Sequence, residues 1–249
     1  MNLIFIGTAG CGKTSLTYTF GEWLREELDA RVSYINLDPG VHQLQYITSY
    51  DVREIVTVDE LLQKGFGPNG AMIRAAEIIE ERLSEIVWKV NSIQSDFKLI
   101  DTPGQMELFL FRSMGPRFVE EIGRNSTTVA IYIMDPVLSS SPIDLVVSLM
   151  LPLITRFRLK IPVVSVVNKS DLREVEQMEK YLMDTDFLRK DLATKDLGII
   201  VDLSMRCIEI IDEFSKNFRV VKVSAKTGEG MSDLYTLIHE AICECGDLM

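Results

Sequence analysis

The chain has 249 residues, of which 47% are hydrophobic and 25% are charged. This composition provides enough apolar material for a sizeable core and argues against a disordered protein. A formal net charge of -11 disfavours non-specific binding to nucleic acid or to an anionic membrane, so a bound phosphate must be held by a strong local device.

Short apolar runs alternate with helical patterns along the chain. We expect strands at residues 3–6, 32–37, 97–100, 129–134, 162–167 and 219–223. We expect helices at residues 13–28, 51–62, 72–90 and 231–243. This alternation predicts a mostly parallel sheet with helices on both faces, which is a three-layer α/β fold.

The connection between the second and third expected strands is long and contains at least one helical pattern. A tight hairpin is therefore excluded, and we expect the two strands to be parallel neighbours joined by a crossover. Residues 172–217 form a mixed-charge helical stretch between two expected strands. We interpret this stretch as a helical insertion into one domain that spans residues 1–249.

The cysteine pattern is typical of a reduced, cytoplasmic protein. None of the four cysteines forms a C-x-x-C element, and the two histidines do not complete a zinc site. The start of the chain shows no signal-peptide pattern. The longest mostly apolar stretch, residues 145–154, is too short to span a bilayer. We therefore expect no membrane partner and, given the negative charge, no direct nucleic-acid partner.

The first motif follows the first expected strand and opens a helix. Residues 7–14 read G-T-A-G-C-G-K-T, which fits the phosphate-binding pattern G-x-x-x-x-G-K-[ST]. Backbone N–H groups and the helix N-terminus favour phosphate here, Lys13 is expected to reach the β- and γ-phosphates, and Thr14 to ligate magnesium. The alternative is an ordinary glycine turn before a helix. The expected phosphate-binding residues are Gly10, Cys11, Gly12, Lys13, Thr14 and Ser15.

A second motif, D-T-P-G-Q at residues 101–105, directly follows an expected strand. At that strand end Asp101 can hold the magnesium through water, and Gly104 offers a backbone N–H to the γ-phosphate. Gln105 can orient the attacking water. The alternative is a plain turn, which a Pro-Gly pair favours.

Two further strand ends carry residues suited to guanine. In N-K-S-D, residues 168–171, Asp171 can accept hydrogen bonds from guanine N1–H and N2–H, which adenine lacks, and the Lys169 stem can pack over the base. In S-A-K, residues 224–226, the Ala225 N–H is expected to donate to guanine O6. Each motif alone is a weak signal, but four motifs in this order at strand ends predict a GTP site. The expected base-binding residues are Asn168, Lys169, Asp171, Ser224, Ala225 and Lys226.

With these motifs the chain resembles the GPN-loop GTPases over nearly its whole length. The distinguishing element of that family is G-P-N, which lies within G-F-G-P-N-G at residues 65–70, the expected GPN loop. N-L-D-P at residues 36–39 and D-V-R at residues 51–53 also look like the family. L-Q-Y at residues 44–46 departs from the expected L-P-Y, which concerns the shape of that loop. The resemblance implies a P-loop NTPase fold.

The resemblance also implies roles for residues outside the four motifs. It implies a homodimer in which Asn69 reaches into the partner's active site, and it makes Asp38 a partner of the magnesium or of the attacking water. From the residues alone, G-P-N-G is a turn and Asp38 caps a helix or forms an Asp-Pro turn. The implied catalytic residues are Lys13, Asp38, Asn69 and Gln105. The implied metal ligands, partly through water, are Thr14, Asp38 and Asp101.

Three functions follow from these residues. The leading hypothesis is hydrolysis of GTP to GDP and phosphate by a magnesium-dependent homodimer, with the GPN loop acting in trans. The alternative is a nucleotide-regulated assembly factor or chaperone, in which hydrolysis only resets the binder. Similar eukaryotic proteins are linked to RNA polymerase assembly, so the resemblance implies RNA polymerase subunits as a client. A third hypothesis, a P-loop kinase, is disfavoured because N-K-S-D and S-A-K serve a guanine base.

Overall fold

The computed structural model describes residues 1–215 and 219–246, and this part of the chain contains a seven-stranded sheet. The strand order is β3-β2-β4-β1-β5-β6-β7, and every neighbouring pair is parallel. The expected parallel pairing is confirmed, because β2 and β4 are neighbours with Val32 opposite Phe97. The strands are β1 (Asn2–Gly7), β2 (Val32–Asn36), β3 (Tyr50–Asp51), β4 (Phe97–Asp101), β5 (Thr128–Met134), β6 (Val163–Val167) and β7 (Val220–Lys222).

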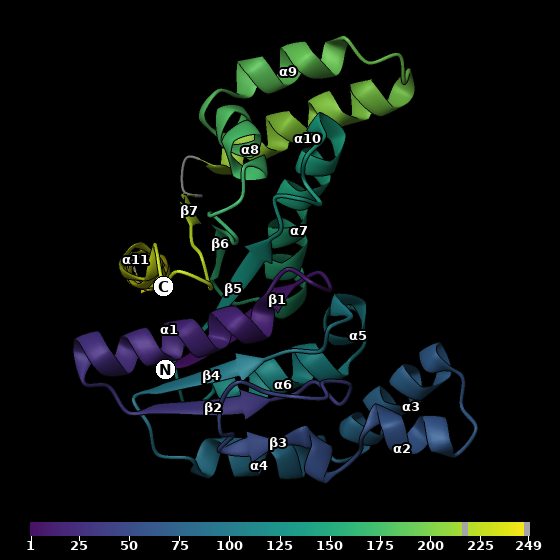
Figure 1. The fold of residues 1–249 in the computed structure, drawn as a ribbon, viewed down its shortest axis with the longest axis vertical. Helices are drawn as coiled ribbons and strands as arrows, with labels where there is room; N and C mark the ends of the chain where they lie inside the picture. The colour runs from purple at the N-terminus through teal and green to yellow at the C-terminus, as the bar shows by residue number, and fades with distance from the viewer. Residues whose placement is uncertain (216–218, 247–249) are drawn as a thin grey trace.

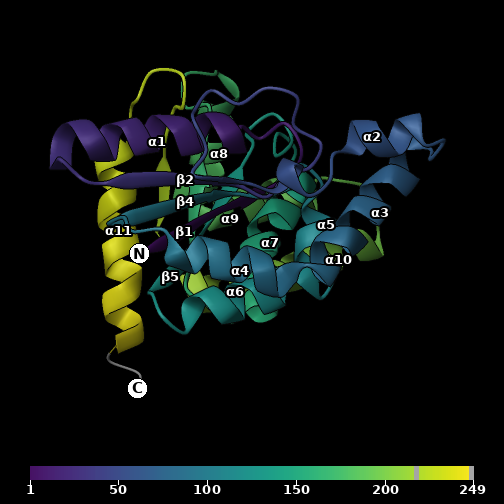
Figure 2. The same ribbon diagram turned by 90° about the horizontal axis from the view of Figure 1, so that it is seen from below.

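Helices cover both faces of the sheet, which confirms the three-layer architecture. Leu16, Phe20 and Leu24 recur at helical spacing and pack α1 against one face, where α11 also lies. The other face is covered by α4, α6 and α7, and Figure 2 shows α1 on one side of the sheet and α4 and α6 on the other. These five helices are α1 (Lys13–Leu28), α4 (Leu83–Ser92), α6 (Met114–Gly123), α7 (Pro142–Leu159) and α11 (Met231–Gly246).

The remaining helices extend beyond the sheet. The hairpin of α2 and α3 projects from it, and α8, α9 and α10 form a separate tier next to α7 (Figure 1). This tier lies between β6 and β7 in the chain, where the insertion 172–217 is expected; residues 216 and 217 fall outside the described residues. The bounds are η1 (Val52–Glu54), α2 (Val58–Gln63), α3 (Pro68–Glu81), α5 (Met106–Leu110), α8 (Glu174–Met183), α9 (Thr185–Ala193) and α10 (Ile199–Ser215). Among the described residues, no helix has both the length and the apolar character needed to cross a bilayer.

The expected turn at G-P-N-G is wrong. Gly67 is the N-cap of α3, and Pro68 occupies its first helical position, so Asn69 is helical rather than left-handed. Proline is well suited there, because its missing N–H would be unpaired in any first turn and its φ already matches a helix. In the segment 65–70, residues 65–67 therefore connect α2 to α3, and residues 68–70 form the start of α3.

Two expected helices are also divided. The stretch 51–62 begins with the short strand β3 and the 3-10 turn η1, and only α2 is α-helical. The stretch 72–90 is split at Arg82, which ends α3 and precedes α4. The apolar spacing continues across this break, so periodicity alone does not reveal it.

Candidate nucleotide-binding site

The loop between β1 and α1 has the backbone of a phosphate-binding loop. Gly10 and Gly12 have φ of 79° and 93°, a region that residues with a Cβ rarely adopt. A Cβ on Gly12 would also lie 2.4 Å from the Asn168 Nδ2 atom. Lys13 is buried and its Nζ donates to the carbonyls of Gly7 and Thr8, each at 3.0 Å. The ammonium group is thus held inside the loop, beside the N-terminus of α1, where an anion is favoured.

Asp101 lies at the end of β4 next to Thr14. The Thr14 Oγ1 donates to Asp101 Oδ2 at 2.6 Å, while Oδ1 of Asp101 is buried without a hydrogen-bond partner. Burial raises the pKa of Asp101 to about 6. A buried carboxylate with one free oxygen beside a threonine hydroxyl fits magnesium, which binds through one or two protein oxygens, phosphates and water. Thr14 and Asp101 are therefore the residues that would hold the ion.

Asp38 joins the loop after β2 to the loop after β4. Its Oδ1 accepts from the Gly40 N–H at 2.8 Å, which is the expected local turn, and its Oδ2 accepts from the Gly104 N–H at 2.9 Å. The Gly104 N–H, which we expect to face a γ-phosphate, thus donates to Asp38 in this structure. Burial raises the pKa of Asp38, and the charge of Asp38 in turn raises the pKa of Asp101. The structure therefore brings Asp38 close to Asp101 and Lys13.

Asn168 connects three of the motifs. Its Nδ2 donates to the Cys11 carbonyl at 2.8 Å, and its Oδ1 accepts from the Ala225 N–H at 3.1 Å. The hydrogen bond from Ala225 to guanine O6 stays a prediction, because this N–H is already paired. The Ser224 Oγ donates to Asp171 Oδ1 at 2.8 Å, which lowers the pKa of Asp171 and keeps it ionised for a base with two N–H donors.

Asp135 is a site residue that sequence analysis missed. Lys169 has a left-handed backbone, with a φ of 61°. Its Nζ lies 2.7 Å from Oδ2 of Asp135 and forms an ion pair with it. The Asp135 side chain is only 5% exposed. The other oxygen, Oδ1, accepts from the Val137 N–H at 3.0 Å. The signal for Asp135 was its place directly after the strand 129–134, at the same edge as the other motifs. Asp135 fixes the ammonium end of the Lys169 side chain.

Asn69 and Gln105 are not brought into this cluster. Gln105 is exposed and stands at the N-cap of α5. Asn69 is exposed in the first turn of α3, directly after the connection from α2. The α2–α3 hairpin projects from the sheet in Figure 1. In that view the hairpin tip lies far from the loop between β1 and α1. In that view the start of α3, which carries Asn69, therefore lies away from the phosphate-binding loop.

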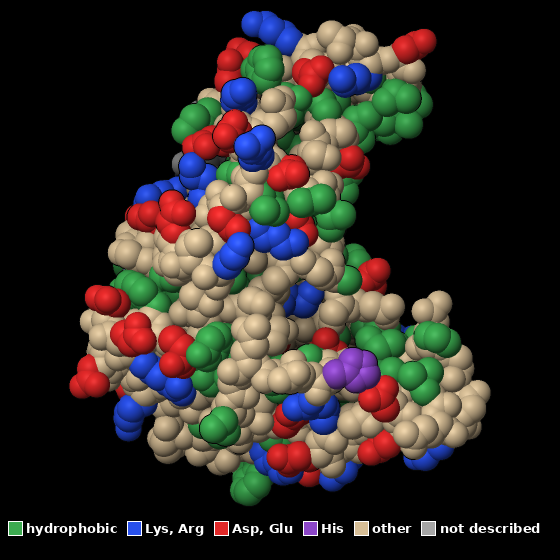
Figure 3. Space-filling model, viewed as in Figure 1, with side chains coloured by type: hydrophobic (Ala, Val, Ile, Leu, Met, Phe, Trp, Pro, Cys, Tyr) green, Lys and Arg blue, Asp and Glu red, His purple; other side chains and the backbone are tan. Residues whose placement is uncertain are grey.

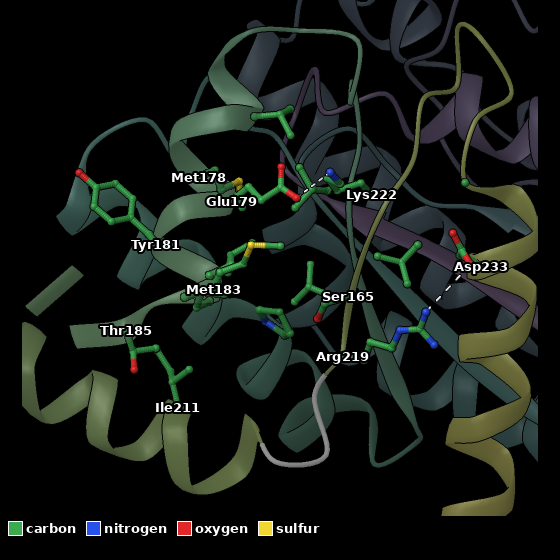
Figure 4. Close-up of a pocket in the computed structure, with 18 of the residues that line it drawn as sticks. Ser165, Met178, Glu179, Tyr181, Met183, Thr185, Ile211, Arg219, Lys222 and Asp233 are labelled. Carbon is green, nitrogen blue, oxygen red and sulfur yellow. Dashed lines mark hydrogen bonds and ion pairs between the residues drawn. The ribbon is translucent and has the colours of Figure 1, made fainter. Parts of the chain in front are cut away.

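A separate cavity of about 480 Å³ lies between β6, β7, α7 and α8 (Figure 4). Apolar side chains such as Leu153 and Met178 line it, and the ion pair of Lys222 with Glu179, at 2.7 Å, stands at one side. None of the expected site residues lines this cavity. It is therefore distinct from the nucleotide motifs.

Comparison with known proteins identifies similar chains. Residues 5–244 match the model of a family described as conserved hypothetical ATP binding protein. A GPN-loop GTPase of Pyrococcus abyssi is 39% identical, with 100% of both chains covered. The GPN-loop GTPase 1 of Dictyostelium discoideum is 27% identical over 96% of this chain, which spans 60% of that relative.

The solved structures include one with the same fold throughout. It is the crystal structure of a GTPase in apo form from Pyrococcus abyssi, with a TM-score of 0.85 and 37% identity. The match covers 98% of each chain. The α/β P-loop NTPase architecture expected from the motifs is confirmed by this likeness.

Proposed function

The chain belongs to the GPN-loop GTPases, a family of GTP-hydrolysing proteins, and we propose that it works as a magnesium-dependent homodimer in which Asn69 of each subunit acts at the nucleotide site of the other. The observation that carries this proposal is the place of Asn69. Lys13, Asp38 and Asp101 converge at the carboxyl ends of the strands, whereas Asn69 is exposed on a projecting hairpin. In a homodimer, the nucleotide site of the second subunit would be the place at which the Asn69 side chain acts.

The guanine base follows from the Asp171 carboxylate. With its pKa lowered by the Ser224 hydroxyl, Asp171 stays charged and can accept hydrogen bonds from two N–H donors of the base. Adenine supplies neither donor at that edge, and an unpaired carboxylate costs binding free energy. The description of the matching family model mentions ATP, but N-K-S-D and S-A-K support GTP.

The proposed mechanism is in-line attack of water on the γ-phosphate. Lys13 and the N-terminus of α1 bind the phosphates. Magnesium, held by Thr14 and Asp101, would neutralise charge on the β- and γ-phosphates when bound. A γ-phosphate that takes the Gly104 N–H frees Oδ2 of Asp38 to accept a hydrogen bond from the attacking water.

Two neutral side chains complete the proposed mechanism. Gln105 is exposed next to Gly104 and is free to turn toward the same water. Asn69 of the partner subunit offers an amide N–H to a phosphoryl oxygen, where negative charge develops in the transition state.

Phosphate release from magnesium-GTP tests this function. We expect Asn69→Ala to lower kcat about a hundredfold, the size of effect seen when a single transition-state donor is removed. Affinity for GDP should stay unchanged, because the amide contacts the γ-phosphate region only. Gln63→Ala, an exposed position on the same hairpin, serves as the matched control and should hydrolyse GTP at the wild-type rate. Wild-type turnover by Asn69→Ala would contradict the role of Asn69, and cleavage of ATP as fast as GTP would contradict the base assignment.

We further propose that hydrolysis resets a protein-binding surface, with RNA polymerase subunits as the client that the family resemblance suggests. Exposed apolar side chains on α10 support this proposal, since Ile199 and Leu203 are 73% and 56% exposed. The three described free cysteines, Cys11, Cys207 and Cys243, support a cytoplasmic location. Capture of isolated polymerase subunits should depend on whether the protein holds a GTP analogue or GDP. Equal capture in both states would contradict the proposal.

A further inference from the structure

The loop between β2 and β3, residues 37–49, sends one buried side chain to the metal site. Tyr46 is 8% exposed, and its hydroxyl donates to Asp101 Oδ2 at 3.0 Å. The same oxygen accepts from the Thr14 hydroxyl at 2.6 Å. Both donors therefore lie on one oxygen of Asp101, and the other oxygen has no partner.

The Tyr46 ring is held from behind by Tyr34. The two rings stack with centroids 4.5 Å apart and planes 20° apart. The Tyr34 ring is fixed in turn because it lies against Gly21, where an added Cβ would clash. The Tyr34 hydroxyl does not contact Tyr46; it donates to Glu22 at 2.8 Å. The position of the Tyr46 hydroxyl is thus set by a packed column that starts on α1, although Tyr46 itself lies on a loop.

We infer that Tyr46 is a positioning residue for the magnesium site. Its hydroxyl holds the carboxylate of Asp101 in the orientation that leaves Oδ1 free for a metal-bound water. The inference rests on the proposed function, because it assumes magnesium at Thr14 and Asp101. A carboxylate rotates readily about its last bond, and two donors on one oxygen oppose that rotation. Hydrogen bonds to the ligands of a metal commonly change metal affinity by 10-fold to 100-fold.

The same contact joins two parts of the site. Asp38 and Tyr46 lie on one loop. Asp38 accepts a hydrogen bond from Gly104, which lies just after β4, and Tyr46 donates one to Asp101, the last residue of β4. The loop is therefore attached to the metal site at two points. This gives the L-Q-Y segment a role at the site, although the sequence suggested only a change of loop shape.

Binding of Mn²⁺ to the complex of the protein with GDP tests the inference. Free Mn²⁺ is followed by its electron paramagnetic resonance signal, so the readout does not depend on hydrolysis. We expect Tyr46→Phe, which removes only the hydroxyl, to weaken Mn²⁺ binding about tenfold. Tyr34→Phe is the matched control, because it removes the other hydroxyl of the same stack, and it should change Mn²⁺ affinity less than twofold.

Three outcomes separate the possible failures. If Thr14→Ala binds Mn²⁺ as tightly as wild type, the proposed metal site is wrong. If Thr14→Ala weakens binding but Tyr46→Phe does not, the site stands and the role of Tyr46 is overturned. GDP affinity in EDTA checks the fold. If Tyr46→Phe loses as much affinity for GDP in EDTA as it loses for Mn²⁺, the hydroxyl has a structural role and the inference is also overturned. Combined with Asp101→Asn, Tyr46→Phe should add no further loss.

Discussion

At the scale of single residues, the site contains a buried charge that the protein alone leaves poorly compensated. Asp101 is 1% exposed, and one of its oxygens has no hydrogen-bond partner. Its pKa of about 6 lies above that of a carboxyl in an unfolded chain, because burial disfavours the ionised form. Such an arrangement lowers stability in favour of binding a cation.

Replacing Asp101 with asparagine should stabilise the metal-free protein. The folded-state pKa of Asp101 is raised, so the contribution of this one group to wild-type stability is most favourable below about pH 4 and is lost as the pH rises through about 6. The asparagine amide would not titrate, and the variant should gain about 3 kcal/mol over wild type at pH 7.5. Asp38 is present in both proteins, but its charge helps to raise the pKa of Asp101, so part of the gain comes from removing the repulsion between the two carboxylates.

Chemical unfolding in EDTA, without nucleotide, at pH 4.5 and pH 7.5 measures this difference. The gap between Asp101→Asn and wild type should open between the two pH values. An equal gap at both would show that the carboxylate charge is not its cause. A variant less stable than wild type at pH 7.5 would show that the two hydrogen bonds to Asp101 outweigh its desolvation.

Two residues of the site, Asp135 and Tyr46, were not recognised as site residues from the sequence. Each contacts a motif residue that is far along the chain, 34 residues away for the Asp135–Lys169 pair and 55 for the Tyr46–Asp101 pair. Asp135 is marked only by its place after a strand, and the L-Q-Y segment that contains Tyr46 does not indicate a contact with Asp101. The motif residues were recognisable because glycines, a lysine and carboxylates recur at short spacings that phosphate and guanine chemistry require.

At the scale of elements, the strands that form the centre of the sheet were predictable. Strands buried on both faces are continuous apolar runs, and each of the six expected runs overlaps a strand. The missed strand, β3, has only two residues, Tyr50 and Asp51, and pairs with the end of β2. A pair of residues carries no periodicity, so its strand character comes from β2 alone.

The helix that begins at the GPN segment shows the opposite limit. Local chemistry favoured a turn, and the connection does contain one feature of a turn: Gly65 has a φ of 90° and ends α2, with the Phe66 N–H donating to the Leu61 carbonyl. The chain then enters α3 at once, because Pro68 is suited to a first helical position. The contacts between α2 and α3 favour the helical conformation. No local sequence pattern reveals these contacts.

At the scale of the whole molecule, topology explains where the motifs meet. All strands run in parallel, so the segments after β1, β4, β5 and β6 emerge at one edge of the sheet. The α2–α3 hairpin leaves the connection between β3 and β4 and projects past the sheet. In the space-filling view the molecule is hollowed between this hairpin and the tier of α8, α9 and α10 (Figure 3). A second subunit can enter such a concave side, which agrees with the proposed homodimer.

Mixed dimers of two inactive variants test action in trans. Asn69→Ala keeps an intact phosphate-binding loop, and Lys13→Ala keeps an intact Asn69. If the two are produced together with random pairing, half of the dimers are mixed and one of their two sites has every group, so activity should recover to about one quarter of wild type. Asn69→Ala paired with the double variant Lys13→Ala/Asn69→Ala is the control and should stay inactive, since no subunit supplies Asn69. Activity no higher than the mean of the two parent variants would place Asn69 in its own subunit's site, or outside catalysis, despite its position on the hairpin.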